Sequence, residues 1–264
     1  MAEILSPRPA ATVITVRDGA KGYEILMLRR NLQSDFVGGA YVFPGGGVDE
    51  LDASPAAQRL VFGINDAEAS RRLGLESGGL PYYVACLREL FEEAGLLIAC
   101  DAHGEPVDLS GDDSVRRLAA SRREVNAGDV GFIEMMEREG LRLDARGLEY
   151  VAHWVTPVGP PRRFDTRFFV ALTPPDQVAT HDAGETVADQ WIRPADALDA
   201  HVRGELEMIL PTIRNLEAIA HLGSSLEVLD YAKSLVDVVR VEPRIVARNG
   251  EVRILLPGDD GYDD

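Results

Sequence analysis

Cysteine is scarce in this sequence. Only Cys86 and Cys100 occur among 264 residues, and their spacing fits neither a disulfide framework nor a cysteine-based metal site. We predict that Cys86 lies inside a helix, that Cys100 lies at the end of a strand, and that both are buried free thiols.

Long apolar runs are missing as well. No stretch approaches the roughly eighteen uninterrupted apolar residues of a membrane-spanning helix. The first residues, Met1 to Pro9, do not show the basic region followed by an apolar run that marks a secretory signal. We therefore expect a cytoplasmic protein that does not bind membranes.

Positive charge is in short supply. The chain has 27 Lys and Arg against 44 Asp and Glu, a formal net charge of -17. Such a chain repels the phosphate backbone of DNA or RNA, so nucleic acid is not expected as a partner. A small anionic substrate is still possible, because a bound divalent cation and a few arginines can reverse the local field in one cleft.

Several catalytic motifs are absent too. The sequence has no Gly-x-Ser-x-Gly elbow and no Walker glycine loop. His153, His181 and His201 lack the mutual spacing of a zinc site and are interpreted as structural. Trp154 and Trp191 are expected to pack in the core or in a cleft wall, and stacking on a base is the alternative.

The residues that are present indicate an α/β fold. Hydrophobic residues make up 45% of the chain, and its length suits one domain with helical additions. The expected strands are Ala11 to Val16 paired with Tyr23 to Leu28, Ala40 to Phe43, Leu96 to Cys100, Leu148 to Thr156 and Arg163 to Leu172. The expected helices are short ones between Asp52 and Pro81, one from Pro81 to Ala94, two within Asp112 to Glu139, and two at Gly204 to Leu222 and Ser225 to Val239, followed by a hairpin from Pro243 to Leu256 that turns at Asn249-Gly250.

The strongest chemical signal lies at the end of the helix that starts at Pro81. At about 100° per residue, Glu89, Glu92 and Glu93 share one face, and the apolar residues of that helix lie on nearly the opposite one. Like charges at this spacing destabilise a helix, so a partner is expected for them. A solvated helix face is the simpler interpretation, but clustered carboxylates also suit a hard cation such as Mg²⁺ or Mn²⁺. Arg88, four residues before Glu92, is placed to orient a carboxylate.

A glycine run upstream favours the metal interpretation. The strand expected at Ala40 to Phe43 ends in Pro44-Gly45-Gly46-Gly47, which predicts a tight, exposed turn. Gly45 and Gly46 lack side chains that would keep a cation or a phosphate away from the backbone.

The segment Arg88-Glu89-Leu90-Phe91-Glu92-Glu93-Ala94-Gly95-Leu96 resembles the second half of the Nudix box. Gly46, with Asp52 where the family has glutamate, resembles the first half, and a long insertion separates the two. This split box is similar to one branch of the Nudix hydrolase family, which includes the mammalian peroxisomal coenzyme A diphosphatase and bacterial relatives.

The resemblance implies a Nudix α/β/α sandwich with a mixed sheet. The Nudix domain is expected over residues 1–200, with an insertion within the box at about 53–81 and a helical insert at about 112–139. Residues 201–264 are expected to form a C-terminal helical extension and hairpin, packed on the domain or on a dimer partner.

The resemblance also implies roles for the acidic residues. Glu92, Glu93 and the Gly46 carbonyl are expected to bind Mg²⁺ or Mn²⁺, and Glu89 is a further ligand or the base that activates water. Glu185, six residues before Trp191, matches a loop glutamate that family members place before a tryptophan-bearing strand. A solvated loop acid is the alternative for that residue.

Arginines are the candidates for phosphate contacts, because guanidinium groups match phosphate oxygens in pairs. Arg162, Arg163 and Arg167 lie at the entrance of an expected strand, and Arg29 and Arg30 follow another. Each of them has the ordinary alternative of a surface arginine in an acidic protein.

The expected activity is metal-dependent hydrolysis of a diphosphate bond in coenzyme A or an acyl-coenzyme A. Because the Nudix box occurs in enzymes with different substrates, ADP-ribose, NADH and nucleoside polyphosphates are alternative substrates. A regulator that binds nucleotides without turnover is the alternative function. A homodimer is also expected, because the apolar stripes of the C-terminal helices exceed what a compact core needs.

Overall fold

The computed structural model describes residues 5–33, 37–182, 184–248 and 251–263. A mixed sheet forms the middle layer, with the strand order β10-β2-β1-β9-β8-β11, with β3 beside β2 and with β4 beside β1. Strands β1 and β9 run parallel, whereas β1 and β2 form the expected antiparallel hairpin. The strands are β1 (Arg8–Gly19), β2 (Gly22–Arg30), β3 (Tyr41–Val42), β4 (Gly45–Gly47), β8 (Glu149–Val155), β9 (Phe164–Leu172), β10 (Thr186–Ile192) and β11 (Arg240–Val241).

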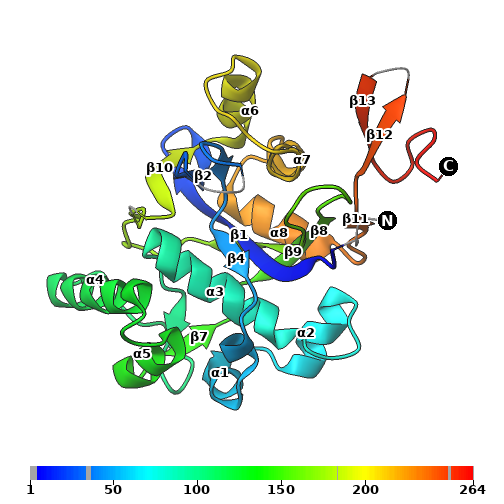
Figure 1. Cartoon of the computed structure of the whole chain (residues 1–264). Helices are drawn as coiled ribbons and strands as arrows, with labels where there is room; N and C mark the ends of the chain where they lie inside the picture. Colours follow the sequence, from blue (N-terminus) through cyan, green and yellow to red (C-terminus); the bar gives the residue numbers. More distant parts are fainter. Residues whose placement is uncertain (1–4, 34–36, 183, 249–250, 264) are drawn as a thin grey trace.

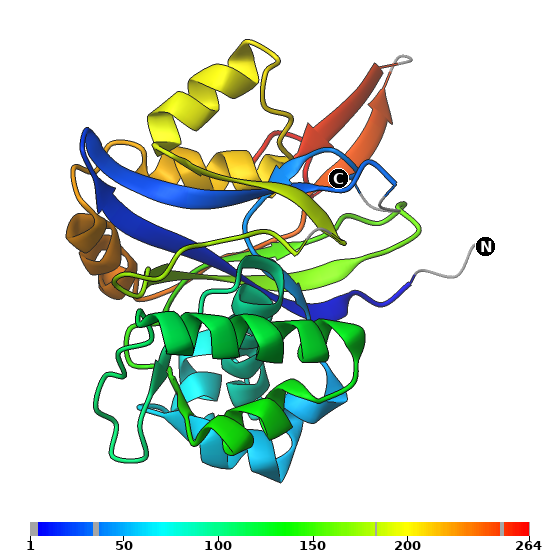
Figure 2. The same cartoon turned by 90° about the vertical axis from the view of Figure 1, so that its left-hand side faces the viewer.

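Helices cover both faces of this sheet (Figures 1 and 2). On one face lie the 3-10 helix η1 (Glu50–Ala53) and α1 (Pro55–Leu60), α2 (Asp66–Leu73), α3 (Leu80–Ala94), α4 (Asp112–Ala127) and α5 (Phe132–Glu139). A small sheet of β5 (Val61–Phe62), β7 (Arg142–Asp144) and β6 (Ala99–Cys100) packs with them. On the other face lie α6 (Pro194–Val202), α7 (Leu210–Ile219) and α8 (Ser225–Ser234). The expected α/β/α sandwich is confirmed.

Two apolar cores hold the layers together. Tyr83, Leu87 and Phe91 of α3 are buried against the sheet in the first core. In the second core, Leu216 of α7 and Val228 of α8 pack on the opposite sheet face. The apolar stripes of the C-terminal helices are thus buried within this chain, so the reason given above for a dimer no longer holds, and the homodimer stays a prediction.

The C-terminal hairpin consists of β12 (Arg244–Arg248) and β13 (Glu251–Leu255), and it projects from the body of the protein (Figure 1). Its predicted turn at Asn249-Gly250 lies outside the described residues. Among the residues that are described, no helix is both long and apolar enough to cross a bilayer.

Some element predictions were wrong. Leu96 and Leu97 are not in a strand, because the Gln177 side chain pairs with the backbone N–H and C=O of Leu97 (2.9 and 3.0 Å). The glycine run is not an exposed turn but the strand β4, whose Gly46 pairs with Ala11 of β1. Such close pairing needs glycine, since a Cβ on Gly45 would lie 2.5 Å from the Ala11 carbonyl oxygen.

The C-terminal helix predictions were also too long. The chain from Gly204 to Ile209 is not helical, and α7 starts at Leu210, where Pro211 occupies the first turn because it needs no hydrogen-bond partner there. Helix α8 stops at Ser234, before a valine-rich segment that leads to β11. The helix α6 was not predicted.

Candidate active site

Helix α3 carries the glutamates into the middle of the molecule. Proline in its first turn and Gly95 in the left-handed conformation (φ 71°) at its C-cap bound the helix as predicted. Its apolar face is buried, but so is Glu93, at 4% exposure, and the side chains of Glu89 and Glu92 are only 14% and 24% exposed. The glutamates therefore do not form a solvated helix face.

The inserted segment also holds the start of α3. Asp66 of α2 accepts hydrogen bonds from the backbone N–H of Gly78 (3.0 Å) and of Leu80 (2.9 Å). These bonds, first of all the one from Leu80, lower the pKa of Asp66. The insertion thus anchors the helix that it separates from the glycine strand.

The glycine strand and the glutamate helix meet directly, as the split box implied. The Gly45 N–H donates to Glu93 Oε2 (2.9 Å). A Cβ on Gly46 would lie 2.4 Å from Glu89 Oε1. Any side chain at Gly46 would therefore displace Glu89.

Arg88 joins the two halves of the site. Its Nη1 donates to Glu89 Oε1 (2.8 Å) and to Glu92 Oε2 (3.1 Å), and its Nη2 donates to the Gly47 carbonyl (2.8 Å). Arg88 thus contacts the carboxylates of Glu89 and Glu92, and its expected role in orienting them stays a prediction.

Asp52 is the residue whose role the sequence left open. Its carboxylate is 1% exposed and accepts from Arg88 Nε and Nη2, both at 3.0 Å, and from the Asp49 N–H (2.8 Å). Aspartate at the position of the family's glutamate therefore serves as the buried partner of Arg88.

Burial is the main influence on the acid–base properties of the cluster. It raises the pKa of Glu89 to about 7, against the lowering effect of Arg88 and with further raising by Glu92 and Glu185. Burial also raises the pKa of Glu92, and it raises the pKa of Glu93 well above its usual range. These carboxylates carry negative charge at a cost that a nearby cation would remove.

The donor set fits a hard divalent cation. Carboxylate oxygens and a backbone carbonyl are the ligands that Mg²⁺ and Mn²⁺ prefer, and the missing side chain at Gly46 lets the Glu89 carboxylate lie against the backbone of the glycine strand. Within the described ranges, however, no three His, Cys, Asp or Glu side chains already converge as an ion site. Glu89 and Glu92 are held by Arg88, whereas Glu93 is held by Gly45.

Glu185 lies in the loop that leads into β10. Its N–H donates to Asp182 Oδ2 (2.9 Å) and its carbonyl accepts from the Asn31 N–H (2.8 Å), which fixes the backbone on both sides. Its charge contributes to raising the pKa of both Glu89 and Glu93. Glu185 is exposed and lines the same cavity as Gly45 and Gly46, and its proposed role in the site stays a prediction.

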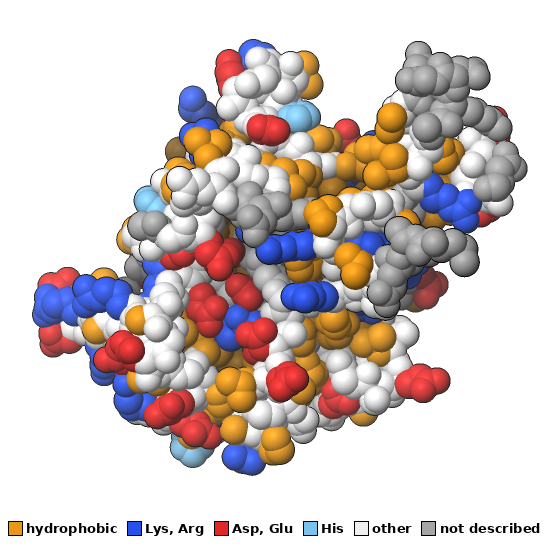
Figure 3. Space-filling view, in the orientation of Figure 1, with side chains coloured by type: hydrophobic (Ala, Val, Ile, Leu, Met, Phe, Trp, Pro, Cys, Tyr) orange, Lys and Arg blue, Asp and Glu red, His pale blue; other side chains and the backbone are white. Residues whose placement is uncertain are grey.

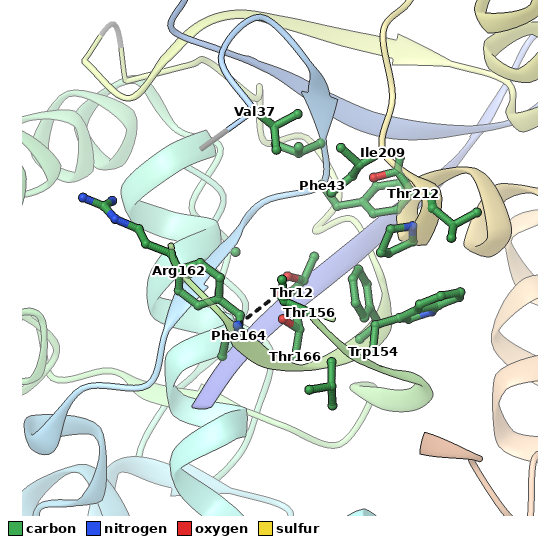
Figure 4. A pocket seen from close by; sticks show the side chains of 18 of the residues that line it. Thr12, Val37, Phe43, Trp154, Thr156, Arg162, Phe164, Thr166, Ile209 and Thr212 are labelled. Carbon is green, nitrogen blue, oxygen red and sulfur yellow. Dashed lines mark hydrogen bonds between the residues drawn. The ribbon is translucent and has the colours of Figure 1, made fainter. Parts of the chain in front are cut away.

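A cavity of about 560 Å³ opens beside the glycine strand. Gly45, Gly46, Gly47 and Glu185 belong to its lining, and further lining residues come from β1, the end of β2, β3, β8, β9, the loop between β8 and β9, the start of α7 and the C-terminal segment. Figure 3 shows acidic side chains near the middle of this face, with basic and then hydrophobic ones toward the hairpin. Trp154 is part of the cavity wall (Figure 4).

The structure separates the candidate arginines. Arg30 and Arg162 line the cavity, and Arg30 also helps to lower the pKa of Glu93. Arg29 does not line the cavity, and its guanidinium lies 6.0 Å from the centre of the Tyr41 ring.

Arg163 and Arg167 are placed elsewhere, in the protein interior. The Arg163 guanidinium donates to the carbonyls of Thr156, Pro157 and Leu5 and pairs with Glu242. The Arg167 side chain, 5% exposed, pairs with Asp165 and lies 4.6 Å from the centre of the Tyr82 ring. Their bonding is structural, and neither is brought to the cavity.

The helical insert supplies two contacts that sequence reasoning missed. Arg122 Nε and Asn126 Nδ2 of α4 both donate to the Glu92 carbonyl (2.9 and 3.1 Å), in the last turn of α3. They satisfy a carbonyl that has no partner within the helix and place a positive charge at its negative end. No sequence spacing indicates this pairing, because 30 residues separate Arg122 from Glu92.

The pKa of Glu89 gives a test of this site. The folded-state pKa of about 7 lies above the ordinary 4.5, so the folded protein holds the proton more tightly. The resulting stability is present below the ordinary pKa and is lost as the pH rises through about 7. With a chelator present, the Tm should fall between about pH 5 and about pH 7.5, and the fall should be smaller in Glu89→Gln. Thermal melts that give parallel pH profiles for the two proteins would contradict this assignment.

Comparisons with known proteins test the resemblance of the chain to a family. The family model described as the NUDT19 Nudix domain matches residues 69–219, which include all of α3 but not the glycine strand. The acyl-coenzyme A diphosphatase NUDT19 of Gallus gallus is 29% identical, over 92% of this chain and 74% of that protein. Its Xenopus laevis counterpart is 26% identical, over 93% and 73%. A NUDIX hydrolase structure from Alicyclobacillus acidocaldarius superimposes with a TM-score of 0.66 at 29% identity, over 86% of this chain and 97% of that one.

Proposed function

The chain belongs to the Nudix hydrolase family, and from this premise we propose that it hydrolyses the diphosphate bond of coenzyme A or an acyl-coenzyme A. Water adds across the bond, and the products are adenosine 3',5'-bisphosphate and phosphopantetheine or its acylated form. The observation that carries this proposal is the buried glutamate cluster at Gly46, which adjoins a largely apolar cavity. The names of the similar acyl-coenzyme A diphosphatases support the substrate class.

Glu92, Glu93 and the Gly46 carbonyl would hold Mg²⁺ or Mn²⁺, with Glu89 as a further candidate ligand. When bound, the cation neutralises the diphosphate and makes phosphorus easier to attack. The raised pKa values of the buried glutamates support this role, because a cation would compensate the cost of their charges.

Two glutamates are candidates to accept the proton of the attacking water. A pKa of about 7 suits Glu89 to exchange protons near neutral pH. Glu185 lines the cavity and lies beside the same cluster. Arg88 is a positioning residue, because it holds Glu89 and Glu92 relative to Gly47.

Arg30 and Arg162 are the proposed phosphate contacts. Both line the cavity, and guanidinium groups pair well with phosphate oxygens. Figure 4 shows the Arg162 side chain on the far side of the cavity from Trp154 and Thr212, which keeps its charge away from the apolar wall.

A cation should stabilise the folded protein. Adding Mg²⁺ or Mn²⁺ at about 100 times its Kd should raise the Tm by about 5 to 10 °C, since only the folded state brings the ligands together. Thermal shift assays of the wild type and Glu93→Gln measure this effect. A Tm that does not respond to either cation would argue against the proposed ligands.

A substrate panel tests the activity itself. The purified chain with Mg²⁺ or Mn²⁺ is given coenzyme A, acyl-coenzyme A, ADP-ribose, NADH and a nucleoside polyphosphate, and products are identified by mass. Fast release of adenosine 3',5'-bisphosphate from coenzyme A substrates is expected. If ADP-ribose or another compound is cleaved faster, the proposed substrate class is wrong. Binding without any turnover would favour the nucleotide-binding regulator.

The location and the assembly stay predictions. A cytoplasmic location rests on the sequence alone. Light scattering at micromolar concentration tests the homodimer, and a monomer there would contradict it.

A further inference from the structure

The cavity beside the glycine strand is larger and more apolar than a diphosphate site needs. Its walls away from the glutamates include Trp154, Phe168, Ile209 and Ile254. Trp154 and Phe168 are 8% and 7% exposed and belong to the core of the α7 and α8 side, so this part of the wall is held by core packing. Apart from the indole N–H of Trp154, these side chains offer only apolar contacts to a ligand.

Sparse hydroxyl groups interrupt the apolar wall. Thr12, Thr156, Thr166 and Thr212 line the cavity (Figure 4). The Thr156 hydroxyl accepts from the Phe164 N–H (3.0 Å), which fixes its position. An apolar wall with a few hydroxyls suits a ligand with a flexible chain of methylene groups and a few amide groups. Each buried amide needs a hydrogen-bond partner, whereas the methylene groups need only apolar contacts.

The charged residues of the cavity are gathered at its other end. Arg30, Glu185 and the glycines adjoin the glutamate cluster, whereas Ile209, Thr212 and Ile254 come from the start of α7 and from β13. A molecule with its diphosphate at Gly46 would therefore extend one arm toward the C-terminal hairpin.

Ile254 of β13 brings the C-terminal hairpin into contact with the cavity. It is 55% exposed, and it lines the cavity together with Pro243. Neither residue belongs to the segment matched by the family model, which ends at 219.

We infer that this cavity binds the acyl-pantetheine arm of the substrate, and that Ile209 and Ile254 form the part of the wall that selects the acyl chain. The inference rests on the proposed function and adds the location of the arm and the source of chain-length preference. The C-terminal hairpin is then part of the substrate site.

The test is a series of straight-chain acyl-coenzyme A substrates with the full chain and Mg²⁺. In the wild type, kcat/KM should rise by about fourfold per added methylene until the cavity is filled, as burial of each methylene predicts. In Ile254→Asp, the ratio of kcat/KM for dodecanoyl-coenzyme A to that for coenzyme A should fall by about tenfold or more, because a carboxylate then borders the chain.

Val252→Asp is the matched control. Val252 lies on the same strand and is 72% exposed, but it does not line the cavity, so its ratio should equal that of the wild type. Ile254→Ala should lower the ratio less than Ile254→Asp. Unchanged thermal melts show that each variant is folded.

The outcomes separate the two ideas. If coenzyme A is cleaved but kcat/KM does not depend on chain length, the proposed acyl site is wrong and the proposed function stands. The same holds if Ile254→Asp lowers kcat/KM by the same factor for every substrate. If no coenzyme A compound is cleaved while another diphosphate is, the proposed function fails first.

Discussion

Glu92→Gln should lower kcat by about 10³-fold and leave the fold intact. The substitution keeps the size of the side chain and its place beside Arg88, but it removes the charge that the cation and the transition state require. Because burial raises the pKa of Glu92, its negative charge does not stabilise the fold. Removing that charge should therefore not lower the free energy of unfolding. Steady-state kinetics and thermal melts on the same preparation measure both effects.

Glu137→Gln is the control for that experiment. Glu137 lies on α5 with an exposed side chain, and the same substitution there should change neither kcat nor Tm. Turnover in Glu92→Gln within threefold of the wild type would rule out the proposed site, while leaving the family assignment untouched.

Arg88→Met should lower the free energy of unfolding by about 3 to 5 kcal/mol. Burial alone would lower the pKa of Arg88, but its hydrogen bonds to Asp52 and the charges of Asp52, Glu89 and Glu92 raise it instead. Removing the guanidinium leaves Asp52, at 1% exposure, as an uncompensated buried charge. Glu89 and Glu92 lose a partner too, but their raised pKa values let them bind protons in its place.

A double-mutant cycle identifies the cause of that loss. Asp52→Asn keeps the oxygen that accepts from the Asp49 N–H but removes the charge. The double variant with Arg88→Met should therefore be more stable than the two separate losses predict, by about 1 to 3 kcal/mol. Urea unfolding with a chelator present measures the cycle, and strictly additive losses would show that the Asp52 charge is not the reason.

The surface pair of Arg116 and Asp113 provides the comparison. These side chains are 70% and 99% exposed, so Arg116→Met should leave the unfolding free energy nearly unchanged. A comparable loss there would mean that the methionine substitution, rather than the broken buried network, causes the effect.

The glutamate site was predictable because its pattern is local. Helical periodicity placed Glu89, Glu92 and Glu93 on one face, and proline and glycine at the right positions bounded α3. The glycine strand was recognised as a backbone surface, although its pairing with β1 was not.

The arginines show where a local pattern fails. Arg162 and Arg163 are neighbours in the sequence, yet one lines the cavity and the other is buried among backbone carbonyls. Both residues precede β9 in an irregular segment, whose backbone conformation, and with it the direction of each side chain, has no periodic pattern in the sequence. Arg167 was a candidate for phosphate contact because of its guanidinium group and its place at an expected strand entrance, although that group packs over Tyr82.

By itself the sequence determined the α/β class, the glutamate helix and the two halves of the split box, because these follow from spacing along one segment. Only the tertiary structure decided that Asp52 pairs with Arg88, that α4 holds the last turn of α3, and that the C-terminal hairpin borders the cavity. Those contacts join segments 30 or more residues apart. Such partners are selected by how the layers pack, and the packing is a property of the whole chain.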